Sequence, residues 1–416
     1  MVLAGLFIAA LLARLALIPI HRFDLGRIST VDTARYLELA ENLRRTWRFE
    51  QSATGGPPAL ENPGGIEIFR TPGYPTFLAL LTFLPGRLEV WALLIQAFLS
   101  ALTVAVAFRA LEILLGPRPA LAAAGLVVID PLHFLYANLL MSDVLFALCF
   151  TLAVALSLEA RAKLGARFAL AGGALFSAAS AIRPVGLLAW LPAGALLYRR
   201  GAPRRAVAVA GLLALLFPMA WTIRNGARTG AFVTSSAFDL NSCLVFAARV
   251  RSRAESLPRE VAQERVMSEL RARAEHLSIA KRLPAMRAFA FAEARAHPLA
   301  AGQALADAAG EFFLAGERRN FLRLAGASGS GRALFASQVA ANTLLTLLAV
   351  AGFGILWRRG ARAEALFAVA TVAAIALPSI VVGNARFRMP VSFLIHGLAG
   401  VAIVAAFEQR RNRAQA

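Results

Sequence analysis

Charged residues are scarce in this sequence. Only 16% of its 416 residues are charged, 58% are hydrophobic, and the mean hydropathy is +0.63. An average soluble domain carries about 25% charged residues, so the composition excludes an ordinary soluble protein. Cysteine is also scarce: Cys149 lies in an apolar run and Cys243 in a polar one, which excludes a disulfide framework and a cysteine-rich metal site. The sequence also lacks internal repeats, glycine-rich phosphate loops and zincin motifs.

Apolar runs near the length of a membrane-spanning helix fill much of the chain. Such a helix needs about 20 predominantly apolar residues. The first 20 residues lack the basic start and the cleavage site of a signal peptide, so we expect a permanent first helix there. The sequence predicts an all-α polytopic membrane protein with about ten transmembrane helices. They are expected at residues 1–20, 88–110, 119–136, 141–158, 168–182, 184–198, 206–222, 334–356, 363–382 and 389–407.

The net charge of +20 and the pI near 11.6 come mostly from arginines in short loops. A high pI is also typical of nucleic-acid-binding proteins, but no basic helix carries base-reading side chains, so we expect no nucleic-acid partner. Short basic loops indicate the cytoplasmic side. If the N-terminus is inside, the basic segments 109–118, 161–167, 199–205, 358–362 and 410–413 all fall inside.

Two long polar segments then fall together on the outer face. They span about residues 21–87 and 223–333, and long connections between helices are usually functional. We therefore expect an N-terminal transmembrane part, 1–222, whose outer loop 21–87 is catalytic. An outer segment, 223–333, and C-terminal helices with a basic tail, 334–416, follow. Within the outer segment, 255–276 predicts a charged helix and 284–314 a segment on the membrane surface.

The first outer loop begins with an amphipathic pattern. Apolar residues recur at helical spacing along one face: Tyr36, Leu39, Ala40, Leu43 and Trp47. The pattern predicts a helix lying along the membrane surface. Ser29 and Asp32 have the spacing of a capping box, which places the start of this helix near Thr30. Residues 51–65 are rich in Gly and Pro and predict irregular structure, and the apolar run 76–84 predicts a second interfacial segment.

Short polar motifs follow one another along the chain. They are Asp32-x-x-Arg35-Tyr36, Arg70-Thr71-Pro72-Gly73-Tyr74-Pro75, Asn138 with Met141-Ser142-Asp143, Arg183-Pro184, Trp221-x-x-Arg224-Asn225 and Arg386-x-Arg388-x-Pro390. In this order they resemble the C-type superfamily of membrane glycosyltransferases, specifically its family 39 group, over nearly the whole chain. That group includes protein O-mannosyltransferases and the bacterial aminoarabinose transferase of lipid A.

The resemblance implies transfer of a sugar from a polyprenyl-phosphate donor to a lipid, glycan or protein acceptor. It also implies a protein of the bacterial inner membrane whose site faces the periplasm, surrounded by membrane lipids. Asp32 takes the place of the family's essential acid, and Asp143 matches an acid of the aminoarabinose-transferase branch. Eukaryotic mannosyltransferases have a second acid after the first, whereas here Thr33 follows Asp32.

This chemistry needs a carboxylate and phosphate-binding cations. A carboxylate takes or orients the acceptor's proton, and Asp32 and Asp143 are the catalytic candidates. Cationic donors stabilise the departing phosphate, and the fork of arginine suits phosphate. Four arginines predicted on the outer face, against the positive-inside rule, are candidates: Arg70, Arg224, Arg386 and Arg388. Arg35, Tyr36 and Tyr74 complete the expected substrate contacts.

Each candidate also has a structural interpretation. The two acids suit the first turn of a helix, the outer arginines can anchor helix ends, and Tyr36 and Trp47 can be interfacial anchors. Arg14, inside the first span, either reaches toward the surface or contacts the lipid phosphate. No histidine spacing indicates a metal site, so we expect no cofactor, although some C-type enzymes use a divalent cation.

Two other function classes remain open. A transporter or flippase of lipid-linked glycans would carry charged groups deep in several helices and related repeats. The later spans here are mostly Ala, Leu and Val, which favours the enzyme. A structural factor of cell-envelope assembly would leave the outer acids and arginines unexplained.

Overall fold

The structure, a computed structural model, describes residues 1–51, 65–163, 165–327 and 332–415. Within these ranges the regular elements are helices, with one isolated bridge between Glu50 and Ile66, so the all-α prediction is confirmed. The predicted irregular segment 51–65 lies mostly outside the described residues. The side chains of 161–163, in one predicted basic loop, lie outside them as well.

The helices fall into three groups along the chain. The first group is α1 (Val2–Leu15), α2 (Ile18–His21), α3 (Leu25–Ile28), α4 (Thr33–Thr46), α5 (Gly73–Leu81), α6 (Leu88–Leu115), α7 (Pro117–Ile129), α8 (Pro131–Ala137), α9 (Asp143–Lys163), α10 (Ala166–Ile182), η1 (Pro184–Ala189), α11 (Trp190–Arg199) and α12 (Arg204–Thr229). The second is α13 (Ala237–Asn241), η2 (Ser242–Ala247), α14 (Ala248–Ala254), α15 (Arg259–Ala274), α16 (Ile279–Ala296), α17 (Pro298–Phe313) and α18 (Arg318–Ala325). The third is α19 (Arg332–Arg358), α20 (Arg362–Ile380), η3 (Ala385–Val391) and α21 (Ser392–Gln415).

Seven helices of the described chain are long and apolar enough to cross a membrane, and the bent pair α7–α8 makes eight. The predicted spans 168–182 and 184–198 correspond to α10 and to η1 with α11. These elements are not among the helices long enough to cross a membrane by length and composition. The chain is therefore an integral membrane protein, and the figure of about ten spans stays a prediction. α12 continues to Thr229, beyond the predicted end at 222, so the outer segment starts later than expected.

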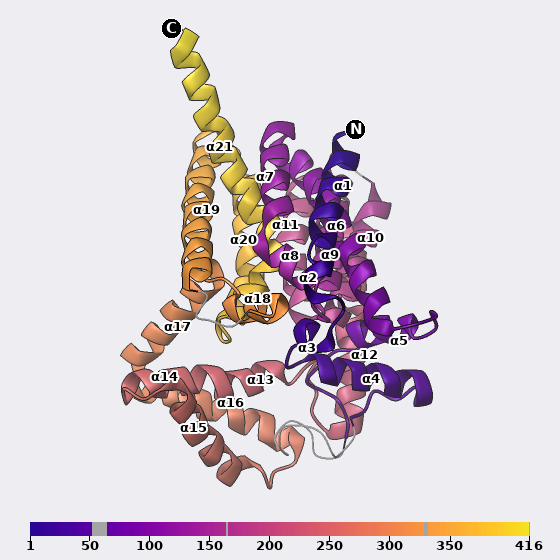
Figure 1. Cartoon of the computed structure of the whole chain (residues 1–416), viewed down its shortest axis with the longest axis vertical. Helices are drawn as coiled ribbons and strands as arrows, with labels where there is room; N and C mark the ends of the chain where they lie inside the picture. The colour runs from indigo at the N-terminus through magenta and orange to yellow at the C-terminus, as the bar shows by residue number, and fades with distance from the viewer. Residues whose placement is uncertain (52–64, 164, 328–331, 416) are drawn as a thin grey trace.

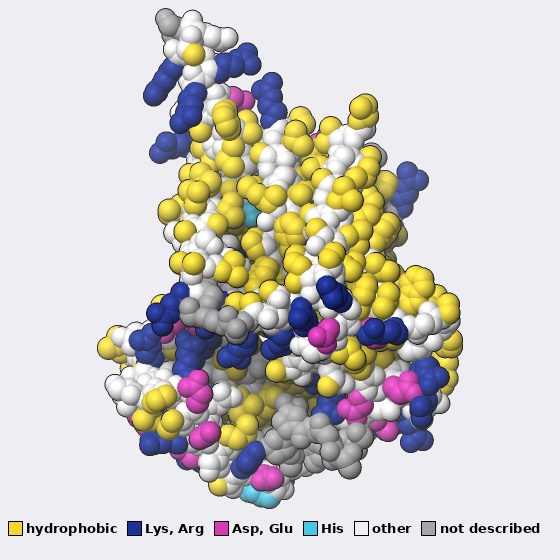
Figure 2. Space-filling view, viewed as in Figure 1, with side chains coloured by type: hydrophobic (Ala, Val, Ile, Leu, Met, Phe, Trp, Pro, Cys, Tyr) yellow, Lys and Arg dark blue, Asp and Glu magenta, His cyan; other side chains and the backbone are white. Residues whose placement is uncertain are grey.

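The two predicted outer segments lie at the same end of the bundle. Figure 1 shows both termini at one end, and α3–α5 and α13–α16 at the other. The predicted inner loops meet near the termini, because Arg118 and Arg359 both pair with Glu408, and Arg200 pairs with Glu364. Figure 2 shows hydrophobic side chains covering the bundle between these ends, with charged side chains gathered beyond it. Which end faces the cytoplasm stays a prediction.

Small residues let the spanning helices approach closely. A methyl group at Gly173 would collide with the Ala210 carbonyl of α12, and one at Gly352 with the Leu398 carbonyl of α21. Helices in lipid gain little from hydrophobic burial against one another, so close van der Waals contact through small residues is a main source of their association.

The predicted span 119–136 is broken in the structure. α7 ends at Ile129, and α8 continues at an angle of 50° after Asp130, whose Oδ1 accepts a hydrogen bond from Leu132 N at 2.8 Å. The break leaves carbonyl oxygens at the end of α7 that lipid cannot satisfy. Arg14, which is fully buried, donates to the carbonyls of Val128 and Val127 at 2.6 and 3.1 Å. Arg14 therefore neither reaches the surface nor contacts a lipid phosphate.

The first outer loop folds differently from a capping box. α4 begins at Thr33, not near Thr30, and no side chain caps it although Asp32 holds the N-cap position. Its first turn is fixed instead by Thr33 Oγ1, which accepts from Thr30 N at 2.8 Å and donates to Leu140 O at 3.1 Å. Because the side chain of Asp32 is not used in capping, it is available for other contacts.

The second interfacial segment is more buried than expected. α5 packs against α4 and α10, with Tyr74, Leu78 and Leu81 buried. Gly73 is required at its start, because a Cβ there would lie 2.6 Å from the Ala181 carbonyl. The Arg70–Pro75 motif therefore holds the first outer loop against the end of α10.

The outer segment is a small helical layer with its own apolar cluster, which includes Cys243, Leu270 and Met286. α15 lies within the predicted charged helix. The predicted surface segment 284–314 forms most of α16 and all of α17, and its place on the membrane surface stays a prediction. Arg249 of α14 ties this layer to the bundle by donating to Glu311 at 2.6 Å and to Val382 O at 2.8 Å.

Candidate active site

A cavity of about 520 Å³ opens between the outer layer and the helix bundle. The first outer loop, η1, residues 233–241, α16, the end of α20 and η3 contribute to its wall. This volume is within the usual range for small-molecule sites, about 300–1,000 Å³. Of the predicted site residues, it brings together Asp32, Tyr36, Arg70 and Arg386.

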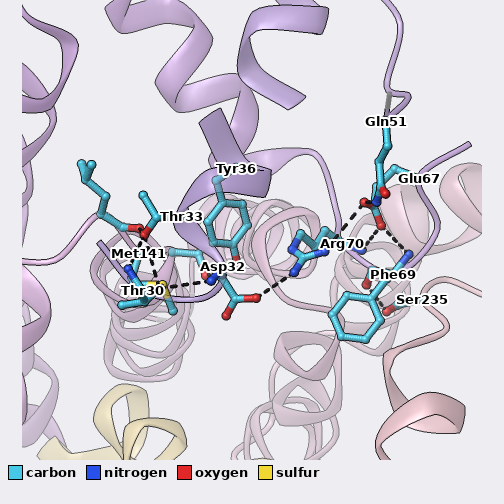
Figure 3. A network of polar contacts seen from close by, with 12 residues as sticks. Thr30, Asp32, Thr33, Tyr36, Gln51, Glu67, Phe69, Arg70, Met141 and Ser235 are labelled. Carbon is cyan, nitrogen blue, oxygen red and sulfur yellow. Dashed lines mark hydrogen bonds and ion pairs between the residues drawn. The ribbon is translucent and has the colours of Figure 1, made fainter. Parts of the chain in front are cut away.

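Asp32 lies between two arginines that are distant in the sequence. Arg70 Nη2 donates to its Oδ1 at 2.8 Å, and Arg386 Nη1 donates to its Oδ2 at 3.2 Å. Figure 3 shows Asp32 and Arg70 directed toward each other, with Tyr36 above them. Each carboxylate oxygen thus has one guanidinium partner. The structural interpretation of Asp32 was that its carboxylate caps a helix. The carboxylate instead pairs with the two arginines, and no side chain caps α4.

Aromatic rings and a buried acid hold the arginines in place. The Arg70 guanidinium carbon lies 5.0 Å from the Phe69 ring centroid, and that of Arg386 lies 4.8 Å from the Phe387 centroid. Glu67 Oε1 accepts from the backbone N–H groups of Phe69 and Arg70 at 2.7 and 2.8 Å, which fixes the turn that carries Arg70. Cation–π contacts of this kind orient arginine while leaving its edge N–H groups for other partners.

Several N–H groups of these arginines have no hydrogen-bond partner among the described residues, although Arg70 Nη1 lies 3.9 Å from Glu67 Oε2 in an ion pair. Arg70 Nε and Nη1 and Arg386 Nε are buried, and none has a hydrogen-bond partner in the part of the chain that the structure describes. Buried donors without partners are rare in native proteins. Their position at a cavity therefore indicates a site for an anion.

The charge of Asp32 is stabilised in this arrangement. Burial alone would raise the pKa of its carboxyl group, but Arg386 and Arg70 outweigh that effect and hold the pKa below its ordinary value. Burial, and then the negative charge of Asp32, raise the pKa of Tyr36, whose hydroxyl lies 3.3 Å from Ser142 Oγ. Asp32 is thus ionised at neutral pH and Tyr36 is neutral.

Sequence comparison gives no relatives: no family model matches the chain, and neither does any curated protein. Solved structures do. The apo crystal structure of the Archaeoglobus fulgidus oligosaccharyltransferase aligns with 99% of this chain and 51% of its own, with a TM-score of 0.58 and 14% identity. The same protein, AglB, in complex with an inhibitory peptide and a dolichol-phosphate gives a TM-score of 0.59 at 12% identity, covering 99% of this chain and 51% of AglB. The chain has the fold of the C-type membrane glycosyltransferases.

The C-type fold is shared over only part of those relatives, since the chain spans about half the length of the oligosaccharyltransferase. ArnT from Cupriavidus metallidurans bound to undecaprenyl phosphate also aligns, over 96% of this chain and 77% of ArnT, with a TM-score of 0.41 and 17% identity. One oligosaccharyltransferase structure is a complex with Zn and sulfate. The described residues of this chain contain no group of three or more His, Cys, Asp and Glu side chains placed to hold a metal ion.

Asp143 stands behind the cavity wall and does not line it. It is almost fully buried at the start of α9, and Oδ2 lies 2.7 Å from Arg183 Nη2. Arg183 lines the cavity and donates to Ser142 Oγ at 3.2 Å. Asp143 is therefore placed to position Arg183 rather than to touch a substrate.

Two predicted phosphate ligands bind main-chain carbonyls instead of facing the cavity. Arg388 donates to Phe312 O at 2.9 Å and to Phe313 O at the end of α17. Arg224 donates to Glu67 O at 2.7 Å and to Phe49 O at 2.9 Å. Both arginines therefore join separate segments of the chain, which differs from the anchoring of helix ends considered from the sequence.

The remaining predicted contacts are also away from the cavity. Arg35 pairs with Glu38 at 2.6 Å on α4. Tyr74 is fully buried, and its hydroxyl donates to Gln96 Oε1 at 2.8 Å. Trp47 is 89% exposed at the end of α4, as an interfacial anchor would be.

Sequence reasoning missed three charged cavity residues, Arg183, Asp239 and Arg287. Arg183-Pro184 was among the motifs of the resemblance, so its order in the chain was a usable signal. Asp239 and Arg287 lie in the outer segment and belong to no motif, and only the fold brings them to the cavity.

Proposed function

We propose that this chain is a glycosyltransferase that moves a sugar from a polyprenyl-phosphate donor to an acceptor at the outer face of the membrane. The observation that carries the proposal is the pair Arg70 and Arg386 beside the cavity. Each donates one N–H to Asp32, and each keeps a further buried N–H group without a hydrogen-bond partner among the described residues. The C-type fold agrees with it. The transporter alternative has no comparable observation in its favour.

The apolar wall of the cavity suits the lipid part of such a donor. Val185 and Leu188 of η1 and Val381 and Val382 after α20 line it. Beyond them Leu377 is 68% exposed, on a surface that a bilayer would cover. A polyprenyl chain would lie along this side, and its phosphate would reach the arginines.

Donor binding changes the partners of Asp32. A phosphodiester brings negative charge to Arg70 and Arg386, and charge-assisted hydrogen bonds to phosphate compete with those to the carboxylate. As the arginines turn to the phosphate, the pKa of Asp32 rises toward its ordinary value. The Asp32 carboxylate, no longer paired with the arginines, then becomes a better proton acceptor.

The transfer itself needs little further machinery. The acceptor's hydroxyl or amine attacks the anomeric carbon and loses its proton to Asp32, while the bond from that carbon to the phosphate oxygen breaks. The polyprenyl phosphate leaves with the electron pair, stabilised by Arg70, Arg386 and Arg183. A single displacement of this kind inverts the configuration at the anomeric carbon.

Binding of undecaprenyl phosphate to the purified protein in nanodiscs tests the proposal. Arg70→Gln and Arg386→Gln should each weaken binding about tenfold or more, because a charge-assisted hydrogen bond contributes roughly 1.5–3 kcal/mol. Arg45→Gln is the matched control, since Arg45 is 68% exposed on α4 and remote from the cavity wall. Unchanged binding in both cavity variants, at unchanged thermal stability, would contradict the proposal.

A further inference from the structure

The outer layer supplies a second polar wall to the cavity, in addition to the one formed around Arg70 and Arg386. Residues 233–241 and α16 contribute Ser235, Asp239, Asn241 and Arg287 to it. Ser235 is already engaged, because its hydroxyl donates to Phe69 O at 2.6 Å. Asp239 and Asn241 are the groups left to receive a ligand.

Asp239 is a buried carboxylate that forms an ion pair with Arg287. The residue is 3% exposed, and its Oδ1 lies 2.6 Å from Arg287 Nε. The contact is short but poorly aligned, so Oδ1 remains a buried acceptor without a hydrogen-bond partner in the described chain. Burial raises the pKa of Asp239, and Arg287 only partly opposes this.

The direction of a bound donor follows from the three walls. The lipid lies along the apolar side, at η1 and α20, and the phosphate lies at Arg70 and Arg386. The sugar projects away from the membrane, toward the outer layer. A hydroxyl group there would give the Asp239 carboxylate a hydrogen-bond donor in addition to Arg287. The Asn241 side chain, which has no hydrogen-bond partner among the described residues, lines the same wall.

We propose that Asp239 and Asn241 bind the sugar of the donor, and that this sugar is a neutral, hydroxyl-bearing one rather than an amino sugar. The inference rests on the proposed function. The preference follows from charge, because Arg287 already supplies a cation to Asp239. A second cation would be repelled by Arg287, whereas a hydroxyl group needs only an acceptor.

The test compares lipid phosphates with and without a sugar. The probes are undecaprenyl phosphate, its glucose, galactose and mannose derivatives, and its aminoarabinose derivative, each bound to the protein in nanodiscs. At least one neutral sugar should bind more tightly than the bare phosphate and than the amino sugar. Asp239→Asn should weaken binding of the preferred neutral-sugar derivative about tenfold, since hydrogen bonds to charged groups contribute roughly 1.5–3 kcal/mol. It should leave the binding of bare undecaprenyl phosphate unchanged. Asn241→Ala should act in the same direction.

The matched control is Asp307→Asn, because Asp307 pairs with Arg253 in the outer layer and does not line the cavity. If no neutral sugar binds better than the bare phosphate, or if Asp239→Asn weakens both probes equally, the sugar site is wrong. An effect confined to the acceptor's KM would also overturn it. If Asp239→Asn does not fold, Asn241→Ala decides. Failure of the proposed function is separate, since it would appear as unchanged phosphate binding in Arg70→Gln and Arg386→Gln.

Discussion

Asp32→Asn should bind undecaprenyl phosphate more tightly than the wild type while losing turnover. Asp32 accepts one hydrogen bond from Arg70 and one from Arg386, at 2.8 and 3.2 Å. A lipid phosphate must replace these contacts. Asparagine keeps a single oxygen acceptor and has no charge, so it competes with the phosphate less.

The size of the effect follows from the hydrogen bonds lost. A hydrogen bond to a charged group contributes roughly 1.5–3 kcal/mol, and asparagine gives up about one of the two. Because about 1.4 kcal/mol corresponds to a factor of ten, phosphate binding should tighten roughly tenfold to a hundredfold. Turnover should fall by at least about a hundredfold, the usual contribution of a general base. The fold should be retained, because the Asp32 side chain does not cap α4.

Both quantities are measured on the same preparation, with the donor taken as the lipid-linked sugar that accumulates in cells lacking the protein. Asp24→Asn is the control, because Asp24 is an exposed acid in the same loop that caps α3 through Gly26 N. Unchanged or weaker phosphate binding in Asp32→Asn would refute the competition, and normal turnover would refute the catalytic role.

Three further predictions concern stability, pH and topology. Arg388→Ala should lower the free energy of unfolding by roughly 1–3 kcal/mol, because buried carbonyls at the end of α17 lose their donor; equal thermal stability of variant and wild type would show that this contact is unimportant. Since the pKa of Asp32 lies below its ordinary value of 3.8, its ion pairs should stabilise the protein fully above that pH and lose their effect as pH falls through the lowered pKa. The stability difference between wild type and Asp32→Asn should therefore stay constant from pH 7 to about pH 4.5, and a difference that changes in that range would show that Asp32 titrates there. Reporter fusions near residues 60 and 270 should lie outside the cell membrane and those near 203 and 360 inside, and opposite sides for 60 and 270 would overturn the topology.

Local patterns were enough to predict most of the fold. Apolar length identified the spans, and the amphipathic stripe identified α4. The apolar run 119–136 does not indicate the break at Asp130, because a run of this length predicts one helix, although Asp130-Pro131 is a good helix start. The amphipathic stripe reaches Trp47, directly after the end of α4 at Thr46. The predicted start near Thr30 is wrong, since Thr33 bonds to Leu140, more than a hundred residues away.

The site could be predicted only in part, because neighbouring residues of one type face different ways. Arg386 and Arg388 are two residues apart in η3, yet one lines the cavity and the other binds carbonyls of α17. Both are outer arginines in the sequence, so nothing local distinguishes them. Asp239 could not be found either, since its role depends on the placement of the whole outer layer over the bundle.

Arg14 has a consequence for how the protein is made. An arginine within a spanning helix costs roughly 2.5–3.5 kcal/mol when that helix inserts alone. The carbonyls that Arg14 binds lie 113 and 114 residues further along the chain, so they are synthesised long after the first helix has left the ribosome. During biogenesis the arginine of the first helix therefore has to be solvated at the membrane surface or in the insertion machinery. It gains its carbonyl partners only after α7 has been inserted beside the first helix. We expect the order of helix assembly to differ from the order of synthesis at this point.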